Sequence, residues 1–323
     1  MIARPIPAVH VAVDEPIRLD RLHRSFGDTH AVVDITLSVR RGHVFGYIGP
    51  NGAGKTTSMR ILATLDLPTR GDAVVDGFSC VNDPEYVRRR LGFMPDAFGT
   101  YRDVSCVEYL DFYARAYGLI GRERTARVAE VMDFTGATGM ADKPIRGLSK
   151  GMKQRLCLGR AMIHDPAVMI LDEPAAGLDP RARIDLRRMI RRLADRGKTI
   201  LISSHILTEL AEMCDSVGII EQGRLLATGS VDEIQRSRGA RRRVEVKLVG
   251  PASEAVAALD GCDPVGEVLA DGHHLSFELD GDDEVQATII SRLVEAGQRV
   301  IEVSSRKKSL EDVFLQVTEG LVQ

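Results

Sequence analysis

The sequence predicts an α/β protein: a domain built on a parallel sheet, followed by a small α+β domain. Short apolar segments of strand length alternate with segments of helical periodicity through most of the chain. The length of 323 residues suits two domains better than one. A basic, glycine-containing stretch at residues 236–243 separates the alternating part from an acidic end. These three observations predict the two-domain organisation.

The composition is that of a folded globular protein. Hydrophobic residues make up 44% of the chain and charged residues 28%, which excludes a disordered chain. No apolar segment reaches the roughly 20 residues that cross a bilayer, and we expect no secretory signal at the start. The five cysteines are scattered without a CxxC pair, which favours reduced thiols over a disulfide framework or a zinc site.

Charge is distributed unevenly along the chain. Residues 240–323 hold 9 Lys and Arg against 16 Asp and Glu, whereas residues 1–239 hold 34 against 30. Neither part has the basic excess of a dedicated nucleic-acid binder, and tryptophan is absent. We therefore expect no nucleic-acid partner.

The elements of the first domain follow a tail, residues 1–16, that has no pattern. Alternating apolar and polar residues predict the first strand, and apolar runs predict the others. Helices are expected at residues 56–65 and within residues 104–147, where apolar residues recur three and four positions apart. The strands are expected at residues 17–22, 31–39, 43–48, 168–171 and 199–203.

The second domain, residues 244–323, follows the expected linker at residues 236–243. Its pattern predicts a small α+β domain of the split βαβ kind. The expected strands are residues 244–248, two strands on either side of Asp271 and Gly272, and residues 300–303. The expected helices are residues 252–259, 284–296 and 310–317.

A glycine-rich segment joins a predicted strand to a predicted helix. Residues 49–56, GPNGAGKT, match the pattern G-x-x-x-x-G-K-[ST]. In this pattern backbone N–H groups converge on phosphate oxygens, and the next helix points its positive N-terminus at the same anion. The lysine reaches the β- and γ-phosphates, and the final hydroxyl binds Mg²⁺. The candidate nucleotide-binding residues are Asn51, Gly52, Ala53, Gly54, Lys55, Thr56 and Thr57.

Two carboxylates, Asp172 and Glu173, follow an apolar strand. In an open α/β sheet, ligands bind at the carboxyl ends of the strands. At this place Asp172 can hold Mg²⁺ through its water shell, and Glu173 can orient the attacking water. A lone strand with this ending more often leads into a solvated turn, but the phosphate loop upstream favours catalysis.

Residues 148–155, LSKGMKQR, lie between these two motifs. The Ser149 hydroxyl and the Gly151 amide at a helix start make an anion site. Alone, the segment predicts only a helix cap. Its position shortly before the acidic strand end favours a phosphate contact.

In this order the motifs resemble those of the ATP-binding subunit of an ABC transporter, over residues 17–234. The matches are the Walker A motif at residues 49–56, the LSGGQ signature at 148–152, Walker B at 168–173, the D-loop at 177–180, the switch histidine at His205 and the adenine-stacking aromatic at Phe26.

The resemblance implies a fold, a reaction and an assembly. The fold is a P-loop NTPase cassette at residues 17–235, with a parallel-sheet core, a β-subdomain and a helical subdomain. ATP and Mg²⁺ lie between the Walker motifs of one copy and the signature of a second copy, in a head-to-tail dimer. Hydrolysis drives export through a separate integral membrane permease, so the chain is expected in the cytoplasm, peripheral on the cytoplasmic face of the cell membrane.

The resemblance also assigns roles to single residues. The catalytic residues are Glu173, His205 and Lys55; Ser149 and Gly151 contact the nucleotide; and the metal-binding residues are Thr56, Asp172 and Asp96. Asp96 departs from the family, which has glutamine there, and an aspartate that begins a turn after Pro95 is the alternative. The signature also departs, because Lys150 replaces glycine; its ammonium either assists γ-phosphate binding or is solvated.

The acidic end resembles the domain appended to exporter ATPases of the drug-resistance and sodium-efflux kind, of ABC-2 type. Those chains close with a stretch like residues 309–314, SLEDVF. Phe98 and Tyr101 are candidates for docking the membrane partner. Two alternatives stay open: a soluble ABC ATPase outside transport, and a weakly hydrolysing regulatory subunit, against which the presence of Glu173 and His205 argues.

Overall fold

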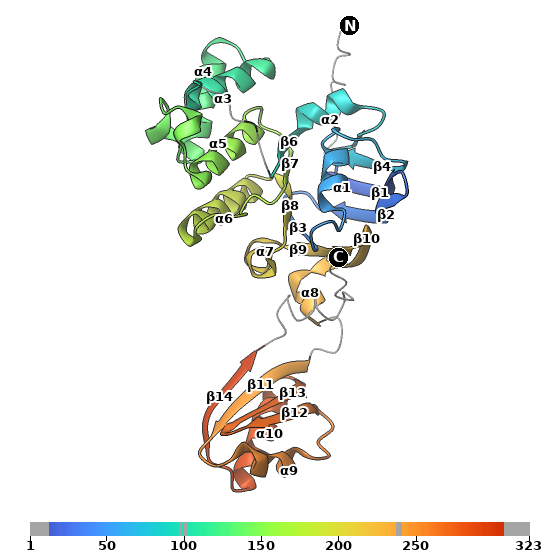
Figure 1. Cartoon of the computed structure of the whole chain (residues 1–323), viewed down its shortest axis with the longest axis vertical. Helices are drawn as coiled ribbons and strands as arrows, with labels where there is room; N and C mark the ends of the chain where they lie inside the picture. The colour runs from blue at the N-terminus through green and yellow to red at the C-terminus, as the bar shows by residue number, and fades with distance from the viewer. Residues whose placement is uncertain (1–12, 97–98, 100–102, 237–240, 307–323) are drawn as a thin grey trace. The chain divides into compact units, whose positions relative to one another are not determined.

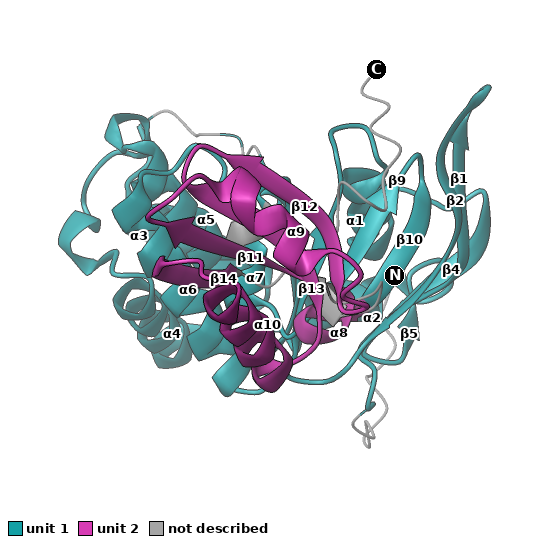
Figure 2. Cartoon of the chain, turned by 90° about the horizontal axis from the view of Figure 1, so that it is seen from below, with its two compact units in different colours: residues 1–228, 322 teal, residues 229–321, 323 magenta. Residues whose placement is uncertain are grey.

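The computed structural model of the chain describes residues 13–96, 99, 103–236 and 241–306, which divide into two compact units (Figures 1 and 2). Unit 1 ends at Thr228 and unit 2 begins at Gly229, before the domain boundary expected at residue 235. Three expectations lie outside the described residues: the helix at 310–317, the stretch at 309–314, and the docking residues Phe98 and Tyr101.

Unit 1 contains the expected parallel sheet. Its six strands run in the order β10-β9-β3-β8-β7-β6, and β3 pairs in parallel with both β8 and β9. The strands are β3 (Val44–Ile48), β6 (Leu91–Met94), β7 (Val168–Leu171), β8 (Thr199–Ser204), β9 (Ser216–Glu221) and β10 (Arg224–Ser230). Every residue of β3, β7 and β8 is buried, as expected where helices cover both faces of a parallel sheet.

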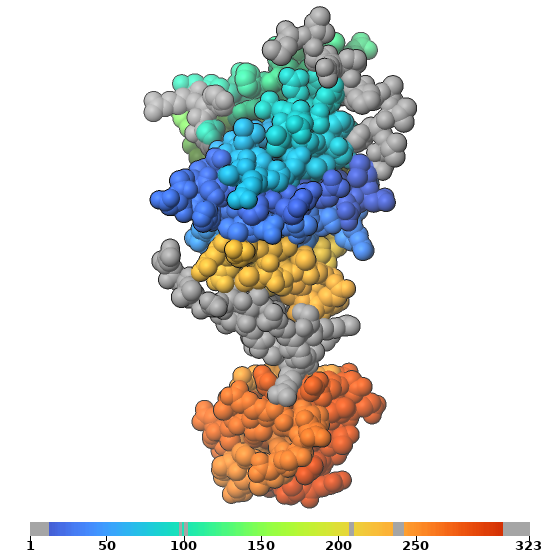
Figure 3. All heavy atoms as spheres, turned by 90° about the vertical axis from the view of Figure 1, so that its right-hand side faces the viewer, coloured from blue at the N-terminus to red at the C-terminus, as the bar shows by residue number. Residues whose placement is uncertain are grey.

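A second, antiparallel sheet of unit 1 has the order β2-β1-β4-β5, and its first strands form the blue surface in Figure 3. The strands are β1 (Ile17–Phe26), β2 (Thr29–Val39), β4 (Arg70–Val75) and β5 (Phe78–Ser79). Strand β1 is longer than the expected 17–22 because register shifts after Leu19 interrupt its alternation, and Arg21 has a positive φ of 43°. Such a bulge hides the period of two that the sequence prediction used.

Helices surround the parallel sheet and form a helical subdomain. Those beside the sheet are α1 (Lys55–Leu62), α2 (Pro84–Arg90), α6 (Pro180–Asp195) and α7 (Leu207–Met213). The subdomain contains α3 (Cys106–Ala116), α4 (Gly121–Phe134), η1 (Thr138–Met140), η2 (Ile145–Gly147) and α5 (Lys150–Met162). Helix α3 begins with a reciprocal pair of hydrogen bonds between Ser105 and Glu108, which satisfies two amides at its N-terminus.

Unit 2 begins with the end of β10 and α8 (Val231–Arg236), followed by the α+β arrangement expected from the sequence. Its sheet has the order β12-β13-β11-β14, and all pairs are antiparallel. The elements are β11 (Arg241–Leu248), η3 (Ala252–Ala255), α9 (Val256–Leu259), β12 (Val265–Asp271), β13 (His274–Asp280), α10 (Asp283–Glu295) and β14 (Val300–Arg306). The expected linker, residues 236–243, is too long, because β11 already pairs with β13 from Arg241 onward.

Each unit has a hydrophobic cluster of its own among the described residues. In unit 1, one cluster joins both sheets through α1, with Leu19, Phe45 and Met59 fully or almost fully buried. In unit 2, a cluster around Phe277 packs the sheet against α9 and α10. All five cysteines are free and buried, in agreement with the expected reduced thiols. Within the described ranges, no helix has the length and apolarity needed to cross a bilayer.

Candidate active site

The phosphate loop connects buried β3 to α1, and contacts with neighbouring backbone fix its path. A Cβ at Gly49 would stand 2.3 Å from the Ile220 carbonyl oxygen, and one at Gly54 would stand 2.3 Å from the Ala31 carbonyl oxygen. Gly54 also has φ +100°, a conformation that L side chains rarely adopt. Only glycine fits both positions, so a larger residue at either one would force the loop from this path.

Lys55 is buried at the start of α1, with 5% of its surface exposed. Its ammonium donates to the carbonyl oxygens of Gly49 and Pro50 at 2.5 and 3.1 Å. Burial lowers the pKa of Lys55, and the carboxylates of Glu173 and Asp172 oppose that shift. The loop therefore contains a cation whose environment favours the arrival of an anion.

The ends of β7 and β8 are joined through one serine. Ser203 donates its hydroxyl hydrogen to Asp172 Oδ1 at 2.7 Å, and its oxygen accepts from the Glu173 amide at 2.8 Å. Asp172 is 2% exposed, so this hydrogen bond offsets part of the cost of burying its carboxylate. Ser203 was not among the residues predicted from the sequence, although it lies two residues before His205 on a strand of clear apolar character.

Glu173 lies between two partners and adopts an unusual backbone conformation. Its φ is +47°, in the left-handed region. One carboxylate oxygen, Oε2, accepts from His205 Nδ1 at 2.8 Å. The other, Oε1, is buried, has no hydrogen-bond partner among the described residues, and lies 3.9 Å from the Lys55 ammonium. A carboxylate held on one side and free on the other is suited to accept a proton from a water molecule.

These residues fit a nucleotide and a magnesium ion. The phosphate loop and Lys55 provide the anion cradle, and Thr56 is exposed in the first turn of α1. Among the described residues, no three His, Cys, Asp or Glu side chains converge to hold a metal by themselves. A site built from Thr56, Asp172, phosphate oxygens and water is the arrangement that Mg²⁺ prefers, because Mg²⁺ keeps much of its hydration shell.

Asp96 is exposed just after β6. The Asp172 amide donates to the Met94 carbonyl oxygen at 2.8 Å, which brings the end of β6 beside the Asp172 backbone. In the part of the chain that the structure describes, Asp96 itself makes no hydrogen bond or ion pair. The structure thus brings Lys55, Asp172, Glu173 and His205 together and leaves Asp96 at the margin.

The signature segment begins α5 and faces the start of α6. The Ser149 hydroxyl caps α5 by accepting from the Met152 amide, and a Cβ at Gly151 would lie 3.4 Å from Ala182 of α6. The Asp179 carboxylate caps α6 by accepting from the Ala182 amide at 2.9 Å. Across the described ranges, no hydrogen bond or ion pair joins Ser149 to the phosphate loop of the same chain.

Two further side chains sit at the edge of this region. Phe26, at the end of β1, is 48% exposed, and the Arg24 guanidinium lies 4.3 Å from the centre of its ring. An exposed ring backed by a cation is a suitable platform for a flat base. Lys150 extends over Gly177, where a Cβ would stand 2.6 Å from its ammonium. Glycine at position 177 therefore leaves the space that Lys150 occupies.

Comparison with known proteins agrees with this geometry. Residues 32–176 match the ABC transporter family, and residues 229–318 match the C-terminal domain of ATP-binding proteins like DrrA1-3. The daunorubicin resistance ATP-binding protein DrrA3 of Streptomyces coeruleorubidus is 32% identical over 308 residues, covering 94% of this chain and 96% of the relative. The Nod factor export ATP-binding protein I of Ralstonia nicotianae is 33% identical over 303 residues, covering 94% and 93%.

A solved structure supports the same conclusion. The ATP-binding subunit of an ABC transporter matches with a TM-score of 0.64 and 32% sequence identity, covering 69% of this chain and 93% of that one. The matched share corresponds to the cassette, and the DrrA-like domain accounts for the C-terminal part. The chain therefore belongs to the ABC transporter family and is one of its ATP-binding subunits, an ABC ATPase.

Proposed function

We propose that this ABC ATPase uses ATP and Mg²⁺ to power export of a substrate through a separate membrane permease. The observation that carries the proposal is Glu173, whose carboxylate is held by His205 on one oxygen and free beside Lys55 on the other. Relatives that match the chain over nearly its whole length are named for drug resistance and for Nod factor export, which supports the direction of transport.

Each side chain of the cluster has a distinct task in hydrolysis. Glu173 orients the attacking water and accepts its proton through the free oxygen Oε1. His205 holds the other oxygen and, with half of its side chain exposed, remains accessible to the γ-phosphate. Lys55 exchanges its two carbonyl acceptors, Gly49 and Pro50, for phosphate oxygens.

The proposed metal site uses Thr56 and Asp172. Bound Mg²⁺ neutralises the charge that develops on the phosphates. The Thr56 hydroxyl at the start of α1 would hold the ion, and the buried Asp172 carboxylate, which Ser203 fixes, would hold its water shell. We propose Asp96 as a further contact to this shell, because β6 ends beside the Asp172 backbone.

The proposed assembly is a head-to-tail dimer. The Ser149 hydroxyl caps its own helix, and a Cβ at Gly151 would lie nearest to Ala182 of α6 and to Leu178. Among the described residues, no hydrogen bond joins these two residues to the phosphate loop of the same chain. A second copy supplies the nucleotide that this signature site contacts. ATP closes the pair because it binds better to the closed state than to the open one.

Substitution of Glu173 by glutamine tests the catalytic proposal. Loss of the proton acceptor lowers kcat at least about 100-fold, whereas ATP affinity is retained because Lys55 and the loop amides remain. Light scattering then detects a stable dimer in the presence of ATP. Glu85→Gln, at an exposed position in the first turn of α2, is the matched control with unchanged turnover. Wild-type turnover in Glu173→Gln contradicts the role of Glu173.

Capture from detergent-solubilised membranes tests the transport proposal. The tagged chain, purified from its native cells, is expected to bring a multi-span membrane protein in near-equal amount. Ribosomal or DNA-bound proteins in its place contradict the permease partnership and support a soluble ABC ATPase.

A further inference from the structure

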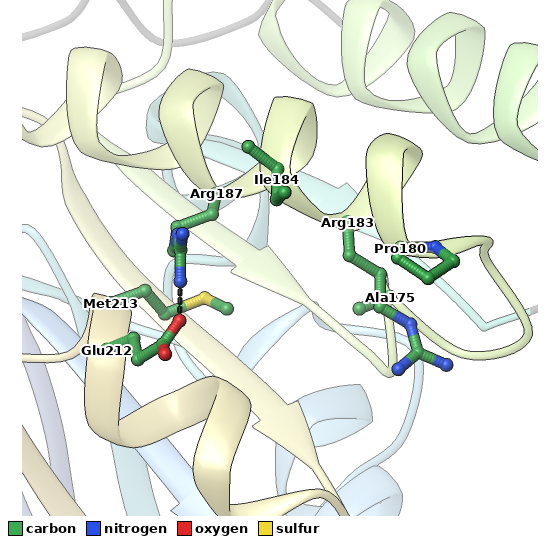
Figure 4. A pocket seen from close by; sticks show the side chains of 7 residues that line it. All are labelled: Ala175, Pro180, Arg183, Ile184, Arg187, Glu212 and Met213. Carbon is green, nitrogen blue, oxygen red and sulfur yellow. Dashed lines mark ion pairs between the residues drawn. The ribbon is translucent and has the colours of Figure 1, made fainter.

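Two arginines of α6 hold the last turn of α7. Arg187 and Arg191 lie four residues apart and therefore share one face of α6. Arg187 pairs with the Glu212 carboxylate, the ion pair drawn in Figure 4. Arg191 donates to the Met213 carbonyl oxygen at 3.1 Å and to Asp215 Oδ1 at 2.9 Å. We call these contacts the α6–α7 clasp.

The clasp stabilises the C-terminal end of α7, where a backbone carbonyl group needs a hydrogen-bond donor. Helix α7 has seven residues, and a helix this short depends on contacts from outside itself. Its last carbonyl groups have no partner within the helix. Arg191 satisfies one of them at Met213 and places a cation at the negative end of the helix dipole. Asp215 also accepts from the Val44 amide at 2.8 Å, which anchors the clasp to the first residue of β3.

An open pocket lies where the two helices face each other. A cavity of about 370 Å³ lies between α6 and α7, and Figure 4 shows the side chains around it. Side chains that do not fill the space between two elements contribute few dispersion contacts there. The Arg187–Glu212 pair of the clasp crosses this pocket, because both residues line it. The cavity is lined by Ala175, Pro180, Arg183, Ile184, Arg187, Glu212 and Met213.

Each member of the Glu173–His205 pair is connected to α6, Glu173 through the chain and His205 through α7 and the clasp. Glu173 is followed by the loop that enters α6 at Pro180, with Asp179 as its cap. His205 directly precedes Ile206 and α7, whose last turn the clasp ties to α6. The two side chains meet at 2.8 Å. A change in how α7 rests on α6 therefore changes how His205 meets Glu173.

We propose that Arg187 and Arg191 are positioning residues for His205: through the clasp they hold α7 on α6, so that His205 is presented to Glu173. The proposal rests on the catalytic roles given to these two residues under Proposed function. It adds that α6 supports both Glu173 and His205. The loop that follows Glu173 enters α6, and the clasp ties α7, which follows His205, to the same helix. Neither arginine touches the nucleotide.

A positioning role and a purely structural role have different signatures. Partly exposed ion pairs contribute little to overall stability, so loss of the Arg187 pair is expected to leave the unfolding temperature nearly unchanged. A small displacement of a catalytic group is costly in rate, and we expect kcat to fall about tenfold. The KM for ATP stays unchanged, because Lys55 and the phosphate loop are untouched.

The kinetic experiment compares five full-length variants with the wild-type chain. Arg187→Ala and Glu212→Gln each remove the ion pair, and both are expected to show the same tenfold loss of kcat, about the cost of a misplaced catalytic group. Arg187→Lys keeps the charge and restores most of the rate. Arg188→Ala is the matched control. Arg188 follows Arg187 on α6 but makes none of the clasp contacts, and 74% of its side chain is exposed. His205→Ala serves as the reference for a lost histidine.

A second readout follows His205 directly. The ring carbon signals of the eight histidines are recorded by NMR, and the His205 signal is identified by its absence in His205→Gln. We expect this signal to shift in Arg187→Ala and to stay in place in Arg188→Ala. An unmoved His205 signal in Arg187→Ala overturns the proposal even if kcat falls, since the effect then bypasses His205. Unchanged kcat, or an equal loss in Arg188→Ala, overturns it too.

The outcome is separable from that of the proposed function. Full turnover in His205→Ala refutes the catalytic role of the histidine, and the clasp proposal fails with it. If His205→Ala loses turnover and Arg187→Ala keeps wild-type turnover, the catalytic role of His205 stands. Only the clasp proposal is then refuted.

Discussion

At the scale of single residues, the active site contains two costly features at Glu173. A non-glycine residue in the left-handed region costs about 1–2 kcal/mol, and the buried Oε1 lacks a hydrogen-bond partner. Both costs accompany the placement of one carboxylate oxygen 3.9 Å from the Lys55 ammonium. The strain is thus localised at the residue that is proposed to activate water.

A second buried titratable group lies outside the site. His164 stacks on Tyr117 with ring centres 3.7 Å apart, and its Nε2 donates to the Leu91 carbonyl oxygen. Its Nδ1 is buried without a partner. Burial lowers the pKa of His164 to about 4, and the hydrogen bond to Leu91 only partly opposes this shift. The folded chain therefore holds this histidine neutral.

This histidine makes stability depend on pH. Its pKa in the folded chain lies below the unfolded value of about 6.5, so its contribution is complete above that pH and is lost as the pH falls toward 4. Between pH 7 and pH 5 we expect a loss of up to about 2 kcal/mol in unfolding free energy. Urea unfolding at several pH values measures it.

The comparison variant for this prediction is His164→Gln, which can still donate to Leu91 but does not titrate. Its stability should fall less between pH 7 and pH 5 than that of the wild type. His30→Gln, at an exposed histidine of the same unit, should behave like the wild type. Parallel pH profiles for wild type and His164→Gln contradict the assignment.

At the scale of elements, the phosphate loop depends on glycine for two different reasons. Gly52 and Gly54 both have positive φ, at +82° and +100°. A Cβ at Gly52 meets nothing within 4 Å, whereas one at Gly54 meets the Ala31 carbonyl oxygen at 2.3 Å. The first position needs only conformational freedom, and the second also needs the missing side chain.

Alanine substitutions separate these two needs. Gly52→Ala is expected to cost about 1 kcal/mol of unfolding free energy from backbone strain alone. Gly54→Ala must also displace β2 or the loop, and we expect about 3 kcal/mol or more together with loss of ATP affinity. Thermal unfolding and titration with a fluorescent ATP analogue measure both effects. Equal losses in the two variants contradict the steric argument at Gly54.

The elements also show which parts the sequence can predict. The phosphate loop and the Asp172–Glu173 strand end were predictable because each is a short local pattern beside a strand of clear apolar character. The link from Ser203 to Asp172 and the α6–α7 clasp join residues far apart in the chain, and no local period encodes such contacts. Strand β5 was missed because it has only two residues, and β4 was missed because its first half, Arg70, Gly71 and Asp72, is polar and lacks an apolar pattern.

At the scale of the whole molecule, each unit has a hydrophobic cluster of its own among the described residues, and the two clusters share no residue. The unit 1 cluster surrounds α1 and therefore supports the phosphate loop, whereas the unit 2 cluster surrounds Phe277. A domain with its own core can unfold as its own cooperative step. A ligand that binds one unit stabilises only the transition of that unit.

Calorimetry of the full chain tests this division. We expect two unfolding transitions, of which ATP raises only the one that belongs to unit 1. At a concentration of 100 times Kd the gain is about 2.7 kcal/mol, or about 5 to 10 °C for a unit of this size. Lys55→Ala should abolish the shift and keep both transitions. A single transition that moves as a whole with ATP contradicts the prediction.

The buried cysteines have a practical consequence for optical experiments. Burial raises the pKa of Cys80 to about 12 and that of Cys157 to about 11, and it also raises the pKa of Cys106 and Cys214. All five cysteines, Cys262 included, are also buried. Since the thiolate is the reactive form and burial limits access, we expect maleimide dyes to react slowly with the native chain at neutral pH. One cysteine introduced at an exposed position such as Arg188 would then carry the dye alone. None of the natural cysteines would then have to be replaced before the chain is labelled for single-molecule fluorescence.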